Sequence, residues 1–235
     1  MARTLVVIPA FNERNNVVQV IRDVQTSLPE VDILVVNDCS SDATSAAARS
    51  VAGVKVVDLP CNLGIGGAVQ TGFKYARDAG YDYLVQIDGD GQHIAGEVRK
   101  LAATMRQNGC DMVIGSRFLE VRSFRTTWAR RCGIKFFEYL FQLLIRARVS
   151  DSTSGFRLYN RRCIELLSCF YSNDYPEPDA IILLHKYGLR LCEVGVAMRP
   201  RQQGESSITL LKSPYYMAKV LLTIFCSCTR RGRAG

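Results

Sequence analysis

Short runs that are apolar throughout alternate with longer segments of helical periodicity in the first half of the chain. A strand without a polar face must be covered on both sides, as in a parallel sheet with helices on each face. The sequence therefore predicts an α/β fold with a mostly parallel central sheet. Strands are expected at 4–10, 32–38, 54–59, 81–88 and 111–117, and helices at 14–28, 42–51, 66–80 and 95–109.

Polar side chains follow most of these expected strands, at the point where each strand ends. Ligands of an open parallel sheet bind at the carboxyl ends of its strands, so these side chains are expected to converge on one edge and form a site. The residues concerned are Asn12, Glu13, Asp38, Asp88, Asp90, Ser116 and Arg117.

Composition limits the number of domains and the kind of partner. The 235-residue chain is 48% hydrophobic and has no Pro-, Gly- or Ser-rich linker and no internal repeat, which favours one sizeable core. Its formal net charge of +8 indicates anionic partners such as nucleotides, lipid phosphates or an acidic membrane surface. Nucleic acid is not expected, because the basic residues alternate with buried-looking strands and no nucleic-acid-binding module is recognisable.

The chain has nine cysteines and two histidines but no C-x-x-C pair. Neither a zinc site nor a disulfide framework is expected, and reduced, mostly buried thiols in a cytosolic chain are predicted instead. The N-terminal apolar run is too short for a signal peptide, and no stretch offers the roughly 20 apolar residues of a membrane-spanning helix. We therefore expect a protein that is soluble or held at a membrane surface.

The spacing Asp88-x-Asp90-x-Gln92 follows an apolar strand-like run. Like charges at this spacing repel, and a bound cation would turn that repulsion into attraction. Oxygen ligands that leave coordination positions open suit Mg²⁺ or Mn²⁺, which commonly bridge to substrate phosphates. The motif therefore predicts a divalent-metal site, the alternative being an ordinary Asp- and Gly-containing turn.

The glycine-rich segment 62–72 follows a strand and opens a helix, yet it does not match a dinucleotide-binding fingerprint. Counted from Gly64, its sixth position is Val69 instead of Gly or Ala. NAD and FAD are therefore not expected. The glycines would instead allow close helix–sheet contact or bring a helix N-terminus near the substrate.

Three further features leave alternatives open. His93 could be a base or a ligand, or it could support the site from behind or be a merely polar loop residue. Glu177 and Asp179 could cap a helix or orient an acceptor or a basic residue. The tail 214–228 is apolar, ends in a basic run and is too short to span a membrane. It is expected to lie at an anionic membrane interface, the alternatives being a core helix and a helix docked on a small membrane partner.

Seven blocks of the sequence together resemble family 2 glycosyltransferases of the A-type fold, and most of all the branch containing dolichyl- and polyprenyl-phosphate sugar synthases. The resemblance runs from about residue 4 to 212 and implies a catalytic domain at 1–212 followed by an amphipathic docking helix and basic tail at 213–235. In chain order the blocks are VVIPAFNE, VVNDCSSDAT, NLGIGGAVQTGFKYA, QIDGDGQH, IGSRF, DSTSGFRLY and RQQGESS.

This resemblance implies an inverting, metal-dependent transferase that uses a nucleotide diphosphate sugar. Two positions depart from the family pattern: Asn37 stands where Asp is usual, and Gly133 stands where Ser is frequent beside Arg131. By motif, the nucleoside would be held by Pro9, Ala10, Asn12, Glu13 and Asp38. Asp88 would lie by the ribose and sugar, Asp90 and Gln92 would bind the metal with Asp88 beside them, and Arg117, Arg131 and Arg201 would hold the phosphates of donor and acceptor.

The expected acceptor is polyprenyl phosphate, which is already an anion and needs no strong base. Two other readings remain: transfer to a saccharide hydroxyl, with Asp179 or Asp151 as base, and a non-catalytic nucleotide-sugar-binding partner of a membrane protein. The chain is expected in the cytoplasm, peripherally attached to the inner face of the plasma membrane, through anionic lipid or a small integral partner. Association with a second copy of the chain is left open.

Overall fold

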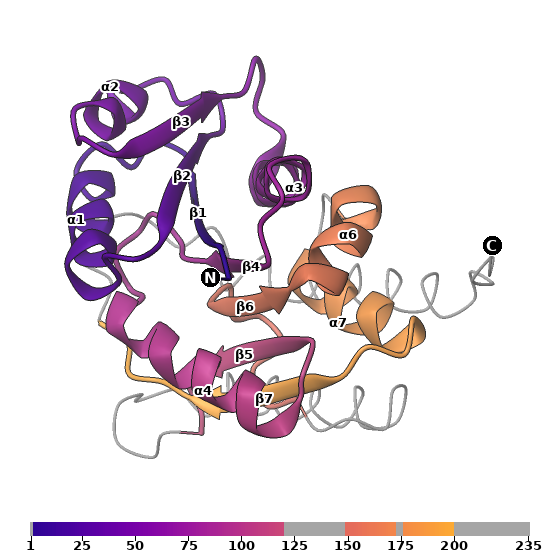
Figure 1. The fold of residues 1–235 in the computed structure, drawn as a ribbon. Coiled ribbons are helices and arrows are strands. Elements are labelled where there is room, and N and C mark those ends of the chain that lie inside the picture. The colour runs from indigo at the N-terminus through magenta and orange to yellow at the C-terminus, as the bar shows by residue number, and fades with distance from the viewer. Residues whose placement is uncertain (1, 120–148, 173–175, 200–235) are drawn as a thin grey trace, which may run out of the picture.

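The computed structural model describes residues 2–119, 149–172 and 176–199. In these ranges the centre of the fold is a seven-stranded sheet of order β3-β2-β1-β4-β6-β5-β7 (Figure 1). Of the described strands, only β6 runs antiparallel to its neighbours, so the predicted mostly parallel sheet is confirmed. The strands are β1 (Thr4–Ala10), β2 (Asp32–Asn37), β3 (Val54–Asp58), β4 (Tyr83–Gln86), β5 (Met112–Ser116), β6 (Arg157–Asn160) and β7 (Leu191–Gly195).

Helices cover both faces of this sheet. Alternate residues of β1 face opposite cores: Leu5 and Val7 belong to one hydrophobic cluster, and Val6 and Ile8 belong to the other. This two-sided burial explains why the strands have no polar face. The first cluster is covered by α3 (Gly64–Asp78), α6 (Arg161–Phe170) and α7 (Pro176–Lys186), and the second by α1 (Val17–Ser27), α2 (Thr44–Arg49) and α4 (Val98–Asn108).

The helices and strands expected in the first half of the chain are present, but some of them begin or end at other residues than expected. The helix expected at 95–109 begins as a short 3₁₀ turn, η1 (Ala95–Glu97), and continues as α4. Helix α3 ends before Gly80, whose φ of +74° is accessible to glycine at little cost. Ser40 and Ser41 precede α2 in the sequence and are of a residue type that commonly caps helices, but its N-cap is Ala43.

Strand β6 was not anticipated from the sequence. Its direction changes which residues reach the carboxyl edge of the sheet, where the parallel strands end. It lies between β4 and β5 and is antiparallel to both. Its first residue, Arg157, therefore lies at the edge where β4 and β5 end. As a result, the residues that precede β6 reach the same edge as the residues that follow β4 and β5.

The expectation of reduced cysteines is wrong for one pair, because Cys110 and Cys192 form a disulfide. They are 82 residues apart in sequence, but β5 and β7 are neighbours, with Val113 opposite Cys192. The expectation of buried thiols also fails in part. Among the free cysteines of the described ranges, Cys163 is buried, whereas Cys39, Cys61 and Cys169 are exposed.

None of the helices in the described ranges is long and apolar enough to cross a membrane. The proposed division of the chain at residue 212 and the docking helix at 213–235 lie outside these ranges.

Candidate active site

The loop after β1 packs against the loop after β2 at the carboxyl edge of the sheet. Asp38 is buried (3% exposed); its backbone N–H donates to the Ala10 carbonyl over 2.9 Å, and its Oδ1 accepts the Leu63 N–H over 2.7 Å. Asp38 therefore joins the end of β1 to the segments that follow β2 and β3, through its backbone and its carboxylate together. Pro9 and Ala10 are buried at the end of β1, beneath this contact.

Asn12 explains why the two serines do not cap α2. Its backbone N–H donates to Ser40 Oγ over 2.9 Å, and its Oδ1 accepts the Ser41 N–H over 2.9 Å. Both serines are thus used to tie the β1–α1 loop to the β2–α2 loop. Asn12 itself has a φ of +56°, a conformation that asparagine tolerates better than most residues.

Glu13 completes this first group of predicted residues. Its backbone N–H donates to Thr44 Oγ1 over 2.8 Å, and its Oε2 accepts from Asn16 Nδ2 over 2.7 Å. The structure therefore brings Pro9, Ala10, Asn12, Glu13 and Asp38 together, as expected. Asn37, which departs from the family pattern, donates from Nδ2 to Asp58 Oδ1 over 2.8 Å.

The turn after β4 carries Asp88, Asp90 and Gln92. Asp90 Oδ1 accepts the Gln92 N–H over 3.0 Å, which fixes the shape of the turn. Gly89 lets this turn approach the first loop closely: a methyl group there would lie 3.1 Å from the Pro9 carbonyl oxygen and 3.6 Å from Glu13 Cγ. The two predicted groups are consequently neighbours.

Gly155, from the DSTSGFRLY block, is a site residue that the sequence reading did not assign. A methyl group at this position would lie 2.6 Å from Asp88 Oδ2 and 2.9 Å from Oδ1. The Asp88 carboxylate therefore rests directly on the backbone of Gly155. The glycine of the DSTSGFRLY block could have indicated this position. Gly155 reaches Asp88, however, only because the unexpected strand β6 is antiparallel.

Arg117 is held beside these acids by Asp151. Its Nε and Nη2 donate to the two carboxylate oxygens of Asp151, each over 2.7 Å, and its backbone N–H donates to Oδ2 over 3.1 Å. Burial alone would lower the pKa of Arg117, but the hydrogen bonds and charge of Asp151, together with the charges of Asp88 and Asp90, raise it. The guanidinium therefore remains a cation directed into an acidic neighbourhood.

The ion pair with Arg117 argues against Asp151 as a general base. The Asp151 side chain is fully buried and bound to a cation, so it is not placed to take a proton from an incoming hydroxyl. The other candidate, Asp179, lies in the first turn of α7.

Breaking the Arg117–Asp151 pair is expected to destabilise the fold substantially, because the largely buried Arg117 charge would lose its partner. Asp151→Asn replaces one carboxylate oxygen by an amide that faces a donor, and we expect the free energy of unfolding to fall by about 3 kcal/mol in urea titrations. The matched control is Glu165→Gln, which breaks the exposed Arg161–Glu165 pair and should cost less than about 1 kcal/mol. Equal losses in the two variants would contradict this prediction.

A second carboxylate, Glu193 on β7, supports the segment that carries Asp151. Its Oε1 accepts the Asp151 N–H over 2.7 Å and the Ser150 hydroxyl over 2.8 Å. Ser150 Oγ in turn lies 2.9 Å from Ser116 Oγ at the end of β5. Nothing in the local sequence around Glu193 indicates this role, because its partners lie more than 40 residues away.

Arg157 is fully buried and organises the same segment from its other side. It donates to the carbonyl oxygens of Ser152, Ser154 and Glu177 over 2.7–2.9 Å, and so joins the segment before β6 to the start of α7. Burial raises the pKa of the Glu177 carboxyl, an effect that the Arg157 cation opposes. Residues 176–179, which include Glu177 and Asp179, thus begin α7 and lie close to the site.

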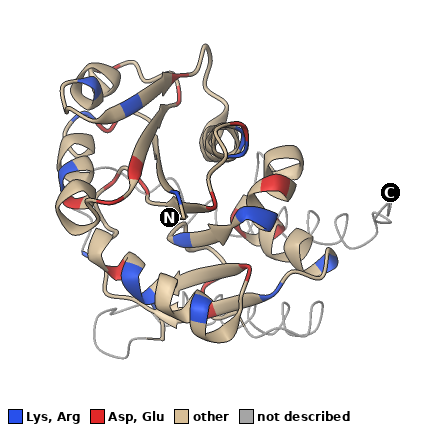
Figure 2. Ribbon diagram, viewed as in Figure 1, with Lys and Arg blue, Asp and Glu red and all other residues tan. Residues whose placement is uncertain are grey.

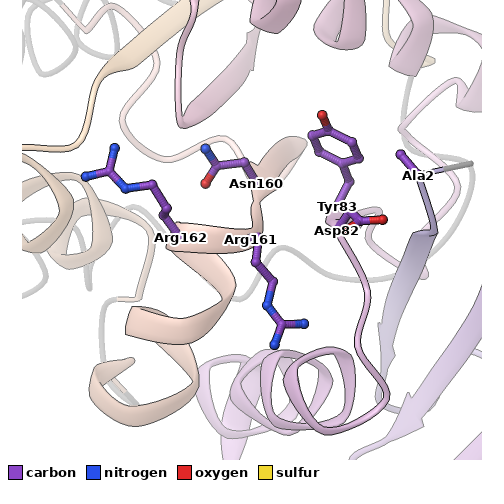
Figure 3. Close-up of a pocket in the computed structure, with 6 residues that line it drawn as sticks. All are labelled: Ala2, Asp82, Tyr83, Asn160, Arg161 and Arg162. Atoms are coloured by element: carbon purple, nitrogen blue, oxygen red, sulfur yellow. The ribbon is translucent and has the colours of Figure 1, made fainter.

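Two pockets are relevant to the location of the site. One of about 380 Å³ lies beside the predicted residues and is lined by Asn15, Asn16, Gln19, Val20, Gly91 and Arg199. The other, of about 370 Å³, lies at the opposite edge of the sheet, where β1 and β4 begin and β6 ends (Figure 3). Its arginines diverge and bind neighbouring acids: Arg161 contacts Glu165, and Arg162 contacts Asp111. The second pocket is therefore separate from the predicted site.

The donor set fits a divalent cation held with the help of substrate. The described ranges contain no group of three or more His, Cys, Asp or Glu side chains that could hold a metal. Asp88, Asp90 and Gln92 would supply only a few oxygen ligands, leaving positions for phosphate oxygens and water, which is how Mg²⁺ is usually bound.

Three predicted features lie outside the described residues: Arg131, Arg201 and the tail. The structure places Arg199, two residues before Arg201 in the sequence, next to the turn after β4, because the Arg199 N–H donates to the Gln92 carbonyl over 2.8 Å.

Comparisons with known proteins identify the fold and the family. The solved structure of glucosyl-3-phosphoglycerate synthase from Mycobacterium tuberculosis, in complex with Mn²⁺, UDP and phosphoglyceric acid, matches with a TM-score of 0.74 at 20% identity, covering 99% of this chain and 80% of that one. At this identity the likeness establishes the fold, and the expected A-type glycosyltransferase fold is confirmed.

Two curated relatives are similar in sequence over most of their length. The polyprenol monophosphomannose synthase of Mycolicibacterium smegmatis is 32% identical over 216 residues, covering 88% of this chain and 81% of the relative. The undecaprenyl-phosphate mannosyltransferase of Micrococcus luteus is 30% identical, covering 88% of each chain. The model of glycosyl transferase family 2 matches residues 5–167, and this chain belongs to that family.

Proposed function

We propose that the protein transfers a sugar from a nucleoside diphosphate sugar to polyprenyl phosphate, with inversion at the anomeric carbon. The observation that carries the proposal is the arrangement of Asp88 and Asp90 on one turn beside Arg117, whose guanidinium is held there by buried Asp151. Charges of both signs at one sheet edge suit a reaction that brings two phosphate-bearing substrates together.

The residues at the ends of β1 and β2 would bind the nucleoside. Asp38 and Asn12 are already fixed by hydrogen bonds to the loops around them, so little ordering is required when the ligand arrives. Pro9, Ala10 and Glu13 would complete this part of the site, and Asp88 would lie by the ribose and sugar.

The turn at residues 88–92, called the metal turn below, would hold Mg²⁺ or Mn²⁺ through Asp88, Asp90 and Gln92. When bound, the cation neutralises charge on the departing diphosphate. Arg117, with Arg131 and Arg201 from the remaining motifs, would hold the phosphates of donor and acceptor. Guanidinium groups suit this role because they remain charged and match phosphate oxygens in pairs.

Lipid phosphate suits this site better as the acceptor than a saccharide hydroxyl. A phosphate monoester is anionic at neutral pH and can attack without a base, whereas a hydroxyl needs one. The burial of Asp151 in its ion pair with Arg117 supports this choice. The names of the two relatives, which specify polyprenol and undecaprenyl phosphate, support it as well.

The distribution of charge supports peripheral attachment to the inner face of the plasma membrane. In the described ranges acidic and basic residues are interspersed (Figure 2). By sequence, residues 120–148 and 200–235 together contain 13 of the 30 Lys and Arg residues but only 3 of the 22 Asp and Glu residues. Cationic segments of this kind favour anionic lipid headgroups. We also propose a catalytic domain at 1–212 and a docking segment at 213–235, which contains four Lys or Arg residues and no Asp or Glu.

One assay tests the proposed reaction. UDP-glucose, UDP-N-acetylglucosamine and GDP-mannose are each incubated with the protein, Mn²⁺ and either undecaprenyl phosphate or an oligosaccharide acceptor. We expect one donor to give a lipid-phosphate sugar, and EDTA to stop the reaction until metal is restored. Product formed only on the oligosaccharide would show that polyprenyl phosphate is not the acceptor. Binding of the donor without any turnover would favour a non-catalytic role.

A further inference from the structure

His93 lies at the meeting point of three segments of the site. It is buried (6% exposed), and its Nδ1 accepts the backbone N–H of Asp88 over 3.1 Å. Its ring stacks on Phe156, with centroids 4.9 Å apart and an interplanar angle of 25°. His93 also forms a β-bridge with Met198. The metal turn, the segment before β6 and the segment after β7 therefore all contact this one residue.

The hydrogen bond from Asp88 fixes the tautomer of the neutral imidazole. A backbone N–H can only donate, so Nδ1 must be the unprotonated nitrogen and the proton must be on Nε2. That nitrogen lies 3.8 Å from Asp88 Oδ2. A single ring thus meets Asp88 both at its backbone and near its carboxylate.

Two further contacts restrict the same carboxylate. Gln86 Nε2 donates to Asp88 Oδ1 over 3.4 Å, and the backbone of Gly155 lies directly behind both oxygens. Gly155 immediately precedes Phe156, on which His93 stacks. A shift of the imidazole would therefore change both the hydrogen bond to Asp88 and the packing behind its carboxylate.

We propose that His93 is a positioning residue, which sets the direction of the Asp88 carboxylate through an acceptor nitrogen at Nδ1. This inference rests on the proposed function, because Asp88 is taken to face the nucleotide sugar and its metal. The competing explanation is that His93 only fills space against Phe156. The two explanations differ in which feature of the ring matters, the acceptor nitrogen or the flat apolar face.

Two substitutions separate these features. His93→Asn can place an amide oxygen near the position of Nδ1 and accept the Asp88 N–H, but it loses the ring. His93→Phe keeps a ring to stack on Phe156 but has no acceptor. We expect His93→Asn to bind Mn²⁺ and nucleoside diphosphate within about threefold of wild type, and His93→Phe to bind at least about tenfold more weakly.

The measurement is a titration of Mn²⁺ followed by its paramagnetic resonance signal, with UDP or GDP present, whichever the wild type binds. Thermal unfolding of the metal-free variants is recorded in parallel. A purely packing role predicts the opposite order, with His93→Phe the more stable variant and the one closer to wild type in Mn²⁺ binding. That result would overturn the inference and leave the proposed function intact, whereas absence of Mn²⁺ binding by wild type with either nucleotide would overturn the proposed function itself.

A spectroscopic measurement on the metal-free protein tests the tautomer independently. The chain has only two histidines, so ¹⁵N-labelled imidazole signals can be assigned with a His185→Gln variant. We expect neutral His93 to be protonated on Nε2 alone. Protonation on Nδ1 would exclude the hydrogen bond from Asp88 and overturn the inference.

Discussion

Replacing Asp90 by Asn is expected to reduce sugar transfer by on the order of 10²–10³-fold while leaving the fold intact. The amide oxygen of Asn can still accept the Gln92 N–H that shapes the turn, so only the negative charge is lost. Asp90→Ala should abolish transfer as well, but it also removes that hydrogen bond. The measurement is turnover of the nucleotide sugar at saturating Mn²⁺, with far-ultraviolet circular dichroism and thermal unfolding to verify the fold.

Asp78→Asn is the matched control for this charge removal. Asp78 lies at the end of α3 with its side chain 66% exposed and paired with Arg77, so its replacement should leave turnover unchanged. Wild-type turnover in Asp90→Asn would refute a metal-binding role for this carboxylate.

Gly155→Ala is expected to lower turnover by about tenfold or more, equivalent to at least about 1.4 kcal/mol in the activation barrier. The added methyl would overlap the Asp88 carboxylate at 2.6 Å, so the carboxylate must move. Because a side-chain end moves more easily than backbone, the cost in folding should stay within about 1–3 kcal/mol. The variant therefore moves the Asp88 carboxylate without removing it, and so tests whether turnover depends on the position of this carboxylate.

Gly96→Ala provides the comparison for Gly155→Ala. A methyl group at Gly96 meets its nearest neighbour, Ser27 Oγ, at 4.0 Å, which is ordinary contact. This variant should retain wild-type turnover and stability. If Gly155→Ala also retained wild-type turnover, turnover would not depend on the observed position of the Asp88 carboxylate.

Much of the site could be predicted because the relevant residues follow buried parallel strands. Asn12, Asp38, Asp88 and Arg117 each come just after an apolar run, and the carboxyl ends of parallel strands meet at one edge. This reasoning needs only the order of elements and the direction of each strand. It does not need the identity of any long-range partner.

The supporting residues could not be found in the same way. Asp151 and Gly155 come before a strand, and they reach the carboxyl edge of the sheet only because β6 is antiparallel. Glu193 acts through hydrogen bonds with residues distant in sequence. His93 could be singled out as a residue that supports the site, but its stacking partner, Phe156, is distant in sequence and could not. The same limit applies to Cys110 and Cys192, whose pairing depends on the adjacency of β5 and β7.

The reversed direction of β6 has a consequence for how the connection between β5 and β6 could be re-engineered. The chain leaves β5 at Ser116 and re-enters the sheet at Arg157, so both ends of this excursion are rooted at the same edge. The Ser116–Ser150 and Arg117–Asp151 contacts join its two ends. A stretch of different length grafted between Arg117 and Ser150 from another family member would therefore leave the pairing of β5 with β6 unchanged.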